Sequence, residues 1–340
     1  MLGRLLTPLR LASTGVALIV LVLILAVTRT GDHYLEVPDQ AHPLENLIKV
    51  PGAKPQDDGG DIYYLDVLLK RASLLESLLP VFRPEGADLV ERAQVAEPGI
   101  SDTERFKLDL ATMKNSQVVA SVVALRQLGY SVPVRAGGVR IVVVTSGSRA
   151  AGVLEPGDVI VAADGKSVRT RPDLTAILGP HRPGDVVKIT VRRGGRRLTF
   201  SIRTTADPER PKRPIIGVLP IQALRVRLPF PIRYDIRRVG GPSAGLAFAL
   251  ELLEKRGRDV DRGYKVAATG EILLDGSVTS IGGIKQKTIG ARKSHVDVFL
   301  VPVDGDNARD AKRYAKGLRI IPVESFQQAL RALATLPRKA

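Results

Sequence analysis

The stretch Gly240-Gly241-Pro242-Ser243-Ala244-Gly245-Leu246-Ala247-Phe248 decides how the carboxy-terminal part of the chain is interpreted. Its glycines and proline predict a sharp turn, and the apolar residues after them predict a helix from Ser243 to about Arg256. A serine at the start of a helix lies near unpaired N–H groups and partial positive charge. Such a serine can attack a carbonyl carbon while those groups stabilise the oxyanion. The alternative is a serine that only caps the helix.

A base for Ser243 is expected in Gly282-Gly283-Ile284-Lys285-Gln286-Lys287. Serine is a weak nucleophile until a base takes its proton, and a buried lysine can act as that base because burial disfavours its charged form. None of the four histidines lies between Ser243 and Lys287, although spacing alone does not exclude a histidine-based triad. Lys287 has an alternative reading as a surface lysine, but helix amino termini disfavour cations.

Strands and helices alternate around these two segments, which predicts a layered α/β or α+β domain over residues 215–337. The expected elements are strands at 215–218, 264–269 and 298–301, and helices at 243–256, 285–293 and 324–334.

Composition narrows the chemistry of the 340-residue chain. It is 44% apolar and 25% charged, as is usual for a globular protein, and it contains no cysteine. Disulfides, thiolate metal sites and thiol catalysis are therefore excluded, and we predict neither a metal site nor a cofactor. The net charge of +16 comes from basic residues spread along the chain, so we expect no specific nucleic-acid binding, and a basic surface near anionic lipid is the preferred interpretation.

The amino terminus predicts a membrane anchor. Leu11 to Val27 carries no charge and is long enough to span the hydrocarbon core, and Arg4 and Arg10 precede it. The positive-inside rule then predicts a single-pass protein of the cell membrane, with a cytoplasmic tip and anchor in residues 1–30 and the main body outside. A cleaved secretory signal is the alternative.

Residues 31–130 predict a hairpin followed by a long helix. Leu44–Val50 and Ile62–Leu69 are expected to pair as strands, with the apolar run from Leu74 to Phe82 packed on them. Ser101-Asp-Thr-Glu104 matches a capping box, and it predicts a helix from about Asp102 to Leu128.

Residues 131–204 change to short β-rich runs around one predicted helix, Arg171–Leu178. The segment Ala150-Ala-Gly-Val-Leu-Glu-Pro-Gly-Asp-Val-Ile-Val-Ala-Ala-Asp-Gly-Lys166 resembles the PDZ domain. This resemblance implies binding of an extended peptide at a sheet edge, by a loop near Ala136-Gly137-Gly138-Val139. Which end of the peptide is bound stays open, and a packing domain without a ligand is the alternative. The proline- and charge-rich residues 205–214 are expected to form a linker to the last domain.

Gly165-Lys166-Ser167 predicts a hairpin turn, not a phosphate-binding loop. Such a loop needs a glycine five residues before Gly165, where this chain has Ile160.

The last domain resembles the proteolytic domain of the Lon proteases. The motifs that carry this resemblance occur in the expected order: Gly241-Pro-Ser-Ala-Gly245, Ala268-Thr-Gly-Glu-Ile272, Ile281-Gly-Gly-Ile-Lys-Gln-Lys287 and Val298-Phe-Leu-Val-Pro302. The resemblance implies that Ser243 is the nucleophile, that Lys287 and not Lys285 is the general base, and that Thr269 orients it. Gly241 and Pro242 would shape the nucleophile turn. Glu271 would support the site, or only the fold.

One position departs from the Lon pattern, because many Lon proteases carry an acidic residue three positions before the serine, where this chain has Gly240. The order of membrane segment, PDZ-like domain and Lon-type domain resembles a bacterial group of membrane-anchored PDZ–Lon proteins. It implies an α+β multidomain protein that cleaves peptides or proteins without ATP, and rings of six copies are expected. The alternative function is an adaptor that binds envelope peptides and has a silent hydrolase-like domain.

Overall fold

The computed structural model describes residues 13, 15–17, 20, 30–54, 59–95, 99–236 and 238–339. Among these residues, no helix combines the length and the apolar character needed to cross a membrane. The predicted cytoplasmic tip and most of the predicted anchor, Leu11 to Val27, lie outside the described residues.

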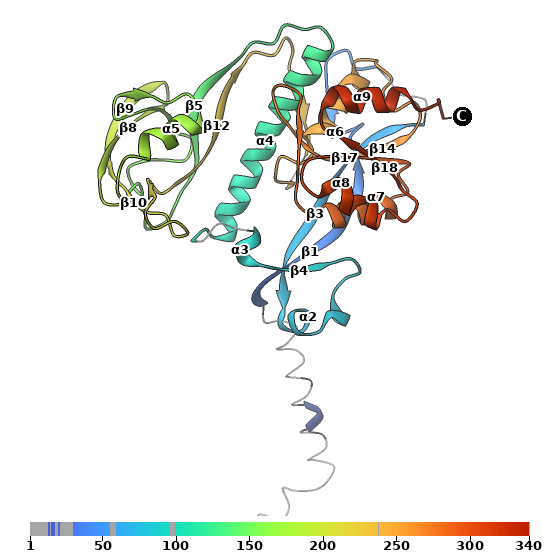
Figure 1. The fold of residues 1–340 in the computed structure, drawn as a ribbon, viewed down its shortest axis with the longest axis horizontal. Helices are drawn as coiled ribbons and strands as arrows, with labels where there is room; N and C mark the ends of the chain where they lie inside the picture. The colour runs from blue at the N-terminus through green and yellow to red at the C-terminus, as the bar shows by residue number, and fades with distance from the viewer. Residues whose placement is uncertain are drawn as a thin grey trace, which may run out of the picture.

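A six-stranded sheet in the order β18-β17-β14-β3-β1-β4 forms the centre of the molecule (Figure 1). Its strands are β1 (Thr30–Pro43), β3 (Asp61–Ser73), β4 (Asp88–Glu91), β14 (Lys265–Ala268), β17 (Val298–Pro302) and β18 (Arg319–Val323). Strand β3 pairs antiparallel with β1 and parallel with β14. The two halves of the chain therefore share one sheet, and we call this sheet with its helices the core domain. It differs from the predicted division into separate regions at 31–130 and 215–337.

Helices cover both faces of this sheet. Because side chains alternate between the two faces along a strand, the apolar clusters that they join show which helices lie on which face. Val266, Ala268 and Leu300 belong to the apolar cluster that contains side chains of α6, α4 and α9, whereas Ala267 and Phe299 belong to the cluster that contains α7 and α8. The helices are α4 (Asp102–Gln127), α6 (Gly245–Lys255), α7 (Ile284–Lys293), α8 (Asn307–Tyr314) and α9 (Phe326–Ala334).

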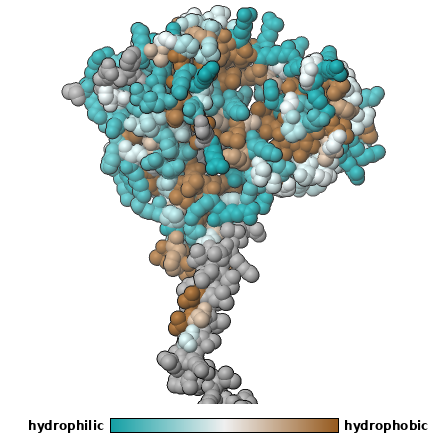
Figure 2. All heavy atoms as spheres, turned by 180° about the vertical axis from the view of Figure 1, so that it is seen from behind, coloured by the Kyte–Doolittle hydropathy of each residue, from teal (hydrophilic) through white to brown (hydrophobic). Residues whose placement is uncertain are grey.

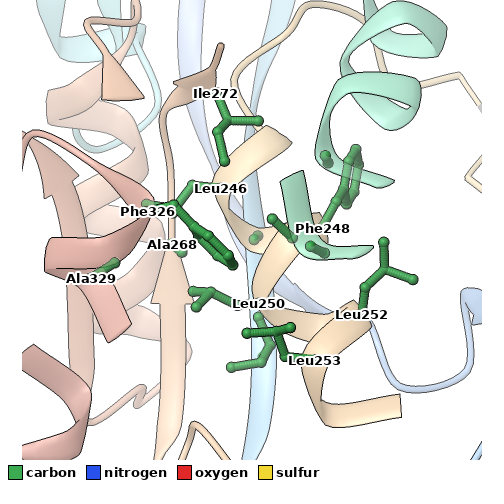
Figure 3. Packing of buried hydrophobic residues seen from close by; sticks show 14 of the residues in the cluster. Leu246, Phe248, Leu250, Leu252, Leu253, Ala268, Ile272, Phe326 and Ala329 are labelled. Atoms are coloured by element: carbon green, nitrogen blue, oxygen red, sulfur yellow. The ribbon is translucent and has the colours of Figure 1, made fainter. Parts of the chain in front are cut away.

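Helix α6 lies at the centre of the larger cluster, because every one of its residues is buried. Figure 3 shows Leu246, Phe248 and Leu250 of α6 among side chains of neighbouring elements, including Ala268, Ile272 and Phe326. A helix that is apolar all round must be enclosed in this way, and its first turn is correspondingly fixed.

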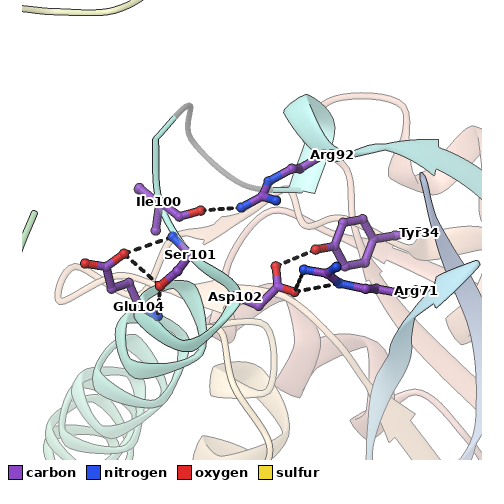
Figure 4. A network of polar contacts seen from close by, with 7 residues as sticks. All are labelled: Tyr34, Arg71, Arg92, Ile100, Ser101, Asp102 and Glu104. Atoms are coloured by element: carbon purple, nitrogen blue, oxygen red, sulfur yellow. Dashed lines mark hydrogen bonds and ion pairs between the residues drawn. The ribbon is translucent and has the colours of Figure 1, made fainter. Parts of the chain in front are cut away.

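Helix α4 is tied to the sheet at its amino terminus. The predicted capping box is confirmed, since Ser101 and Glu104 bond reciprocally across the first turn. Asp102 accepts hydrogen bonds from Tyr34 of β1 and from Arg71 of β3 (Figure 4). The end of α4 is therefore fastened to two neighbouring strands of the core sheet.

A second sheet forms a separate inserted domain, residues 134–226, on the other side of α4 (Figure 1). Its strand order is β12-β5-β6-β8-β9, and β7 pairs with β6. The elements are β5 (Val134–Val144), β6 (Val159–Ala163), β7 (Lys166–Ser167), α5 (Arg171–Leu178), β8 (Val186–Arg193), β9 (Arg196–Arg203) and β12 (Val218–Val226). The turn predicted at Gly165-Lys166 is confirmed, and it joins β6 to β7.

The end of the inserted domain differs from the predicted boundary. Residues 205–214 contain β10 (Thr205–Ala206) and reach β11 (Pro214–Ile215), which pair with each other, so this segment is a closed turn and not an extended linker. Strand β12 then pairs with β5, and Val226 faces Val134 in the register. The chain consequently enters and leaves the inserted domain at adjacent positions.

The predicted hairpin of Leu44–Val50 with Ile62–Leu69 is wrong, because β3 pairs with β1 instead. Only β2 (Ile48–Lys49) forms from the first run, and it pairs with β13 (Arg233–Tyr234). The core domain also contains two small strands that pair with each other, β15 (Glu271–Ile272) and β16 (Val278–Thr279).

The apolar run from Leu74 to Phe82 does not pack on a hairpin as predicted. It forms α2 (Leu74–Leu78) and the short helix η2 (Pro80–Phe82), neither of which contains a buried residue. Helix α3 (Arg92–Val95) follows before α4.

Candidate active site and peptide groove

Ser243 lies in the turn before α6 and does not cap it. The helix begins at Gly245 after Ala244, and no side chain caps it. Instead, the Nζ of Lys287 donates a hydrogen bond to the Oγ of Ser243 at 2.6 Å. The structure therefore brings together the two residues that the sequence singled out, and the geometry does not support the alternative role of Ser243 as a cap.

The turn that carries Ser243 is held by α4 at two points. Gly241, with a φ of +84°, donates its N–H to the carbonyl of Asp109 at 2.8 Å. The Oγ of Ser116 donates to the carbonyl of Pro242 at 2.9 Å. Both partners belong to α4, so this helix supports the turn that Gly241 and Pro242 were predicted to shape.

The carbonyl of Ser243 is fixed by residues that follow β14. It accepts the N–H of Gly270 at 2.8 Å and the hydroxyl of Thr269 at 3.1 Å. These contacts tie the nucleophile turn to the end of this strand.

Lys287 reaches the serine from the first turn of α7, and the residue is only 3% exposed. Burial lowers the pKa of its amine to about 8, while the carboxylates of Asp66 and Glu36 act in the opposite direction. The amine is therefore close to neutral at mildly alkaline pH, which a general base requires.

Thr269 is fully buried, and its Oγ1 accepts a hydrogen bond from the Nζ of Lys287 at 3.2 Å. This contact is consistent with the predicted orienting role. Glu271 lies in β15, where burial raises the pKa of its carboxyl. Among the described residues, no hydrogen bond joins the Glu271 side chain to Ser243 or Lys287.

Lys285, the other lysine of the motif, faces away from the serine. Its Nζ donates to the carboxylate of Asp88 on β4 at 2.5 Å. Two residues of separation on a helix place side chains on different faces, so Lys287 and not Lys285 meets Ser243.

Close packing against α4 explains why position 240 is a glycine. A Cβ there would lie 2.5 Å from the Cβ of Asp109, so the two positions cannot both carry side chains without a shift. Asp109 of α4 therefore fills the space that a side chain at position 240 would need. Its carboxyl lies 3.6 Å from Arg105, and burial raises the pKa of that carboxyl.

Two groups of side chains in the described part of the chain have metal-ligand spacing: Asp39, His42 and Asp66, and Glu254, Asp259 and Asp261. In the first, His42 already lies 3.3 Å from Asp66 and 3.6 Å from Asp39. In the second, Glu254 accepts the backbone N–H groups of residues 260 and 261. The prediction of no metal site stays a prediction.

A groove of about 920 Å³ lies between the inserted domain and α4. Its walls are α5, with Leu174 and Leu178, the start of β12 and the face of α4 that carries Leu108 and Thr112. Strand β12 is an edge strand of its sheet, so a backbone edge runs beside the groove. An extended peptide could add to that edge as a further strand.

The predicted peptide loop at Ala136-Gly137-Gly138-Val139 is corrected by the structure. These residues lie within β5, which pairs with β12 on one side and β6 on the other. A Cβ on Gly138 would meet the carbonyl of Ile160 at 2.4 Å, so this glycine permits close strand packing and does not form an open loop.

The loop that lines the groove is the short connection Ile216–Gly217 between β11 and β12, within the segment 215–218 that was predicted as a strand of the last domain. Gly217 has a φ of +71°, and its carbonyl accepts hydrogen bonds from the N–H of Thr145 and the hydroxyl of Ser148. In the sequence, a glycine between apolar residues directly before a strand is the signal that could have indicated this connection.

A serine hydroxyl bonded to a buried lysine amine is the arrangement that a serine nucleophile with a lysine base would need. Family comparison agrees, since residues 238–335 match the Lon protease (S16) C-terminal proteolytic domain, and residues 126–204 match the PDZ domain. The chain thus combines a PDZ domain with a Lon-type proteolytic domain.

Curated relatives match the carboxy-terminal region. A Lon protease of Mesomycoplasma hyopneumoniae is 37% identical over 26% of this chain and 10% of its own length. Lon protease 1 of Myxococcus xanthus is 38% identical over 29% of this chain and 12% of its own length. The chain therefore spans only about a tenth of the length of these relatives. Among solved structures, the PDZ domain of an SdrC-like protein from Listeria monocytogenes is 29% identical over 25% of this chain and 87% of its own, with a TM-score of 0.23.

Proposed function

We propose that this protein is a membrane-anchored serine endopeptidase that uses Ser243 and Lys287 and works without ATP. The observation that supports this most strongly is the 2.6 Å contact of the serine hydroxyl with a buried amine whose pKa is lowered to about 8. A lysine with its ordinary pKa would be charged at neutral pH and unable to take a proton.

In the proposed reaction, Lys287 takes the hydroxyl proton as the Oγ of Ser243 attacks the peptide carbonyl. The amine then returns this proton to the leaving nitrogen, and an acyl-enzyme remains. Water, activated by the same amine, releases the acyl group. Thr269 keeps the amine directed at the serine through the 3.2 Å contact.

The developing oxyanion needs donors beside Ser243. The backbone N–H groups of Ser243 and Ala244 donate to no other group among the described residues, and they precede the first turn of α6. We propose them as the oxyanion donors, because amides at a helix start also carry partial positive charge.

The PDZ domain would bind extended peptide segments in the groove between α5, β12 and α4. The free edge of β12 supplies backbone groups, and buried apolar side chains such as Leu174 supply pockets. Substrates are therefore proposed to be proteins or peptides with an extended segment.

The anchor, the extracytoplasmic location and the ring of six are proposals from the sequence. Leu11 to Val27 is uncharged and follows two arginines, and no phosphate-binding loop occurs in the 340 residues. These observations support a membrane-bound enzyme that does not couple cleavage to ATP.

The decisive experiment compares Ser243→Ala, Lys287→Ala and Lys285→Ala in the full chain. Cleavage of a casein-derived fluorogenic peptide without ATP, and labelling by a fluorophosphonate, should disappear in the first two variants and persist in Lys285→Ala. Lys285 is the matched control because it lies on the same helix and pairs with Asp88.

Persistent cleavage by Ser243→Ala would exclude this serine as the nucleophile. A folded wild-type chain that resists the probe and cleaves nothing would favour the adaptor function instead.

A further inference from the structure

The segment around α2 and η2 exposes an unusual number of apolar side chains. We call these five residues the apolar base, with the following exposed fractions: Leu74 42%, Leu78 69%, Leu79 46%, Val81 83% and Phe82 52%. Single exposed apolar residues are ordinary on a protein surface, but a group this concentrated marks an interaction surface.

The local structure presents these side chains outward. Ser73 and Glu76 form a capping box that starts α2, and Leu74 and Leu78 are four residues apart, so they share one helix face. Glu76 is the only acidic residue between 74 and 83, and it is held by Ser73 and by an ion pair with Lys70 at 2.8 Å. No free carboxylate therefore interrupts the sequence from 74 to 83.

Chain connectivity places the apolar base beside the predicted anchor. Thr30 of β1 pairs with Ser73, the residue directly before α2. The apolar run ends at Val27, three residues before Thr30, and three extended residues span at most about 10 Å. Figure 1 shows α2 at the end of the core domain where β1 begins, and Figure 2 shows apolar atoms at this end of the molecule.

Basic side chains flank the apolar base. Lys70 and Arg71 are about half exposed, and the guanidinium of Arg83 donates to the carbonyls of Glu76 and Ser77. Apolar residues with cations at their border are the composition of segments that lie in a lipid interface. Lys70 and Arg71 are already paired with Glu76 and Asp102, so the attraction to anionic head groups rests on the net charge of +16.

We propose that the apolar base inserts into the surface of the lipid bilayer that holds the anchor, so that the core domain lies directly on the membrane. This proposal rests on the proposed anchoring by Leu11 to Val27. Lipid is favoured over a second copy of the chain because Thr30 lies within about 10 Å of the end of the anchor and pairs with Ser73, directly before α2. The chain therefore enters the apolar base close to the bilayer surface.

The experiment uses the absence of tryptophan from the chain. Full-length Phe82→Trp is reconstituted into vesicles of phosphatidylcholine and phosphatidylglycerol, with and without phosphatidylcholine brominated in its acyl chains. The bromolipid should quench about half of the emission or more, which should also be blue-shifted, because an inserted indole lies at the depth of the acyl chains. Phe106→Trp is the matched control, since Phe106 is 41% exposed on α4, and its emission should not be quenched.

Flotation of the same vesicles separates the two proposals. If the wild-type chain does not float with lipid, the proposed anchoring is overturned, and the proposed insertion of the apolar base is overturned with it. If the chain floats but the Phe82→Trp variant is quenched no more than the Phe106→Trp variant, only the apolar base is overturned. An emission of Phe82→Trp that responds to protein concentration and not to bromolipid would overturn it in favour of contact between copies.

A second set of variants guards against a local effect of the reporter. Leu78→Glu and Val81→Glu, placed in the Phe82→Trp background, should bring quenching down to the Phe106→Trp value while flotation persists. Unchanged quenching in these variants would contradict insertion.

Discussion

At the scale of single residues, Lys287 combines burial with proximity to two acids. Its pKa is lowered to about 8 by burial, and the carboxylates of Asp66 and Glu36 limit this fall. Only the neutral amine can accept the serine proton, so kcat/KM should rise with pH and level off above about 8. A pH–rate profile with a fluorogenic peptide measures this directly.

Asp66→Asn should move that profile to lower pH. Removing a nearby negative charge destabilises the protonated amine, so the pKa of Lys287 falls further and kcat/KM at neutral pH rises. Glu85→Gln is the control, because Glu85 is exposed and pairs with Lys293. A profile of Asp66→Asn that coincides with wild type would show that Asp66 does not act on the amine.

The buried amine of Lys287 should also lower the free energy of unfolding of the protein. Its pKa in the folded state, about 8, lies below the value of 10.5 for a free lysine, so the unfolded chain binds more protons between these values. The cost in the free energy of unfolding is full below a pH of about 8, at about 3 kcal/mol, and disappears as pH rises toward 10.5.

Lys287→Met should therefore raise Tm at neutral pH by several degrees while abolishing cleavage, and this gain should vanish once pH approaches the pKa of a free lysine. Lys285→Met, which loses the ion pair with Asp88, should show no such gain. Thermal unfolding followed by circular dichroism at both pH values tests this. Equal Tm values for Lys287→Met and wild type at neutral pH would contradict the cost of the buried amine.

At the scale of secondary-structure elements, α4 contacts both candidate sites. Leu108 and Thr112 line the peptide groove, while Asp109 and Ser116 hold the turn before Ser243. The groove and the turn that carries Ser243 therefore share one helix.

Ser116→Ala should lower kcat by about fivefold with little change in KM, because the lost hydrogen bond to Pro242 is worth about 1 kcal/mol and its loss loosens the turn. Ser121→Ala is the matched control. Ser121 is buried on the same helix, but its hydroxyl bonds to Gln117 and Tyr234. Ser116→Thr should recover part of the activity. Equal losses of kcat in the two alanine variants would indicate a general effect on helix packing.

Local signals in the sequence predicted the elements near the site well. The capping box placed the start of α4, α5 has the predicted bounds, and the spacing of glycines around Ser243 and Lys287 predicted two helix starts that meet. The capping box and the helix bounds depend on residues within one helix, whereas the meeting of Ser243 and Lys287, 44 residues apart, was predicted from the order of the motifs.

Pairing between distant strands could not be predicted in the same way. Strand β3 joins β14, which lies about 200 residues later, and β12 joins β5 across the whole inserted domain. The alternation of apolar and polar residues along a strand does not depend on which other strand it pairs with. The predicted boundaries therefore fell where the structure continues the sheet, and the residues predicted as a peptide loop fell within a strand that is paired on both sides.

At the scale of the whole molecule, the PDZ domain should be separable from the core. Replacing residues 136–224 by an Asn-Gly turn would join β5 to β12 where Arg135 faces Arg225. We expect this variant to keep fluorophosphonate labelling of Ser243 and cleavage of short peptides, and to lose preference for long substrates. A variant that folds but is not labelled would show that the inserted domain is required for the nucleophile turn.

The facing residues Val134 and Val226 have a consequence for how such proteins diversify. An inserted domain whose two ends are neighbours replaces a single turn of the core domain. Any domain with adjacent termini can therefore be inserted at the same place. Substrate choice could therefore be exchanged during evolution by recombination at one point, while the chemistry of bond cleavage is inherited unchanged.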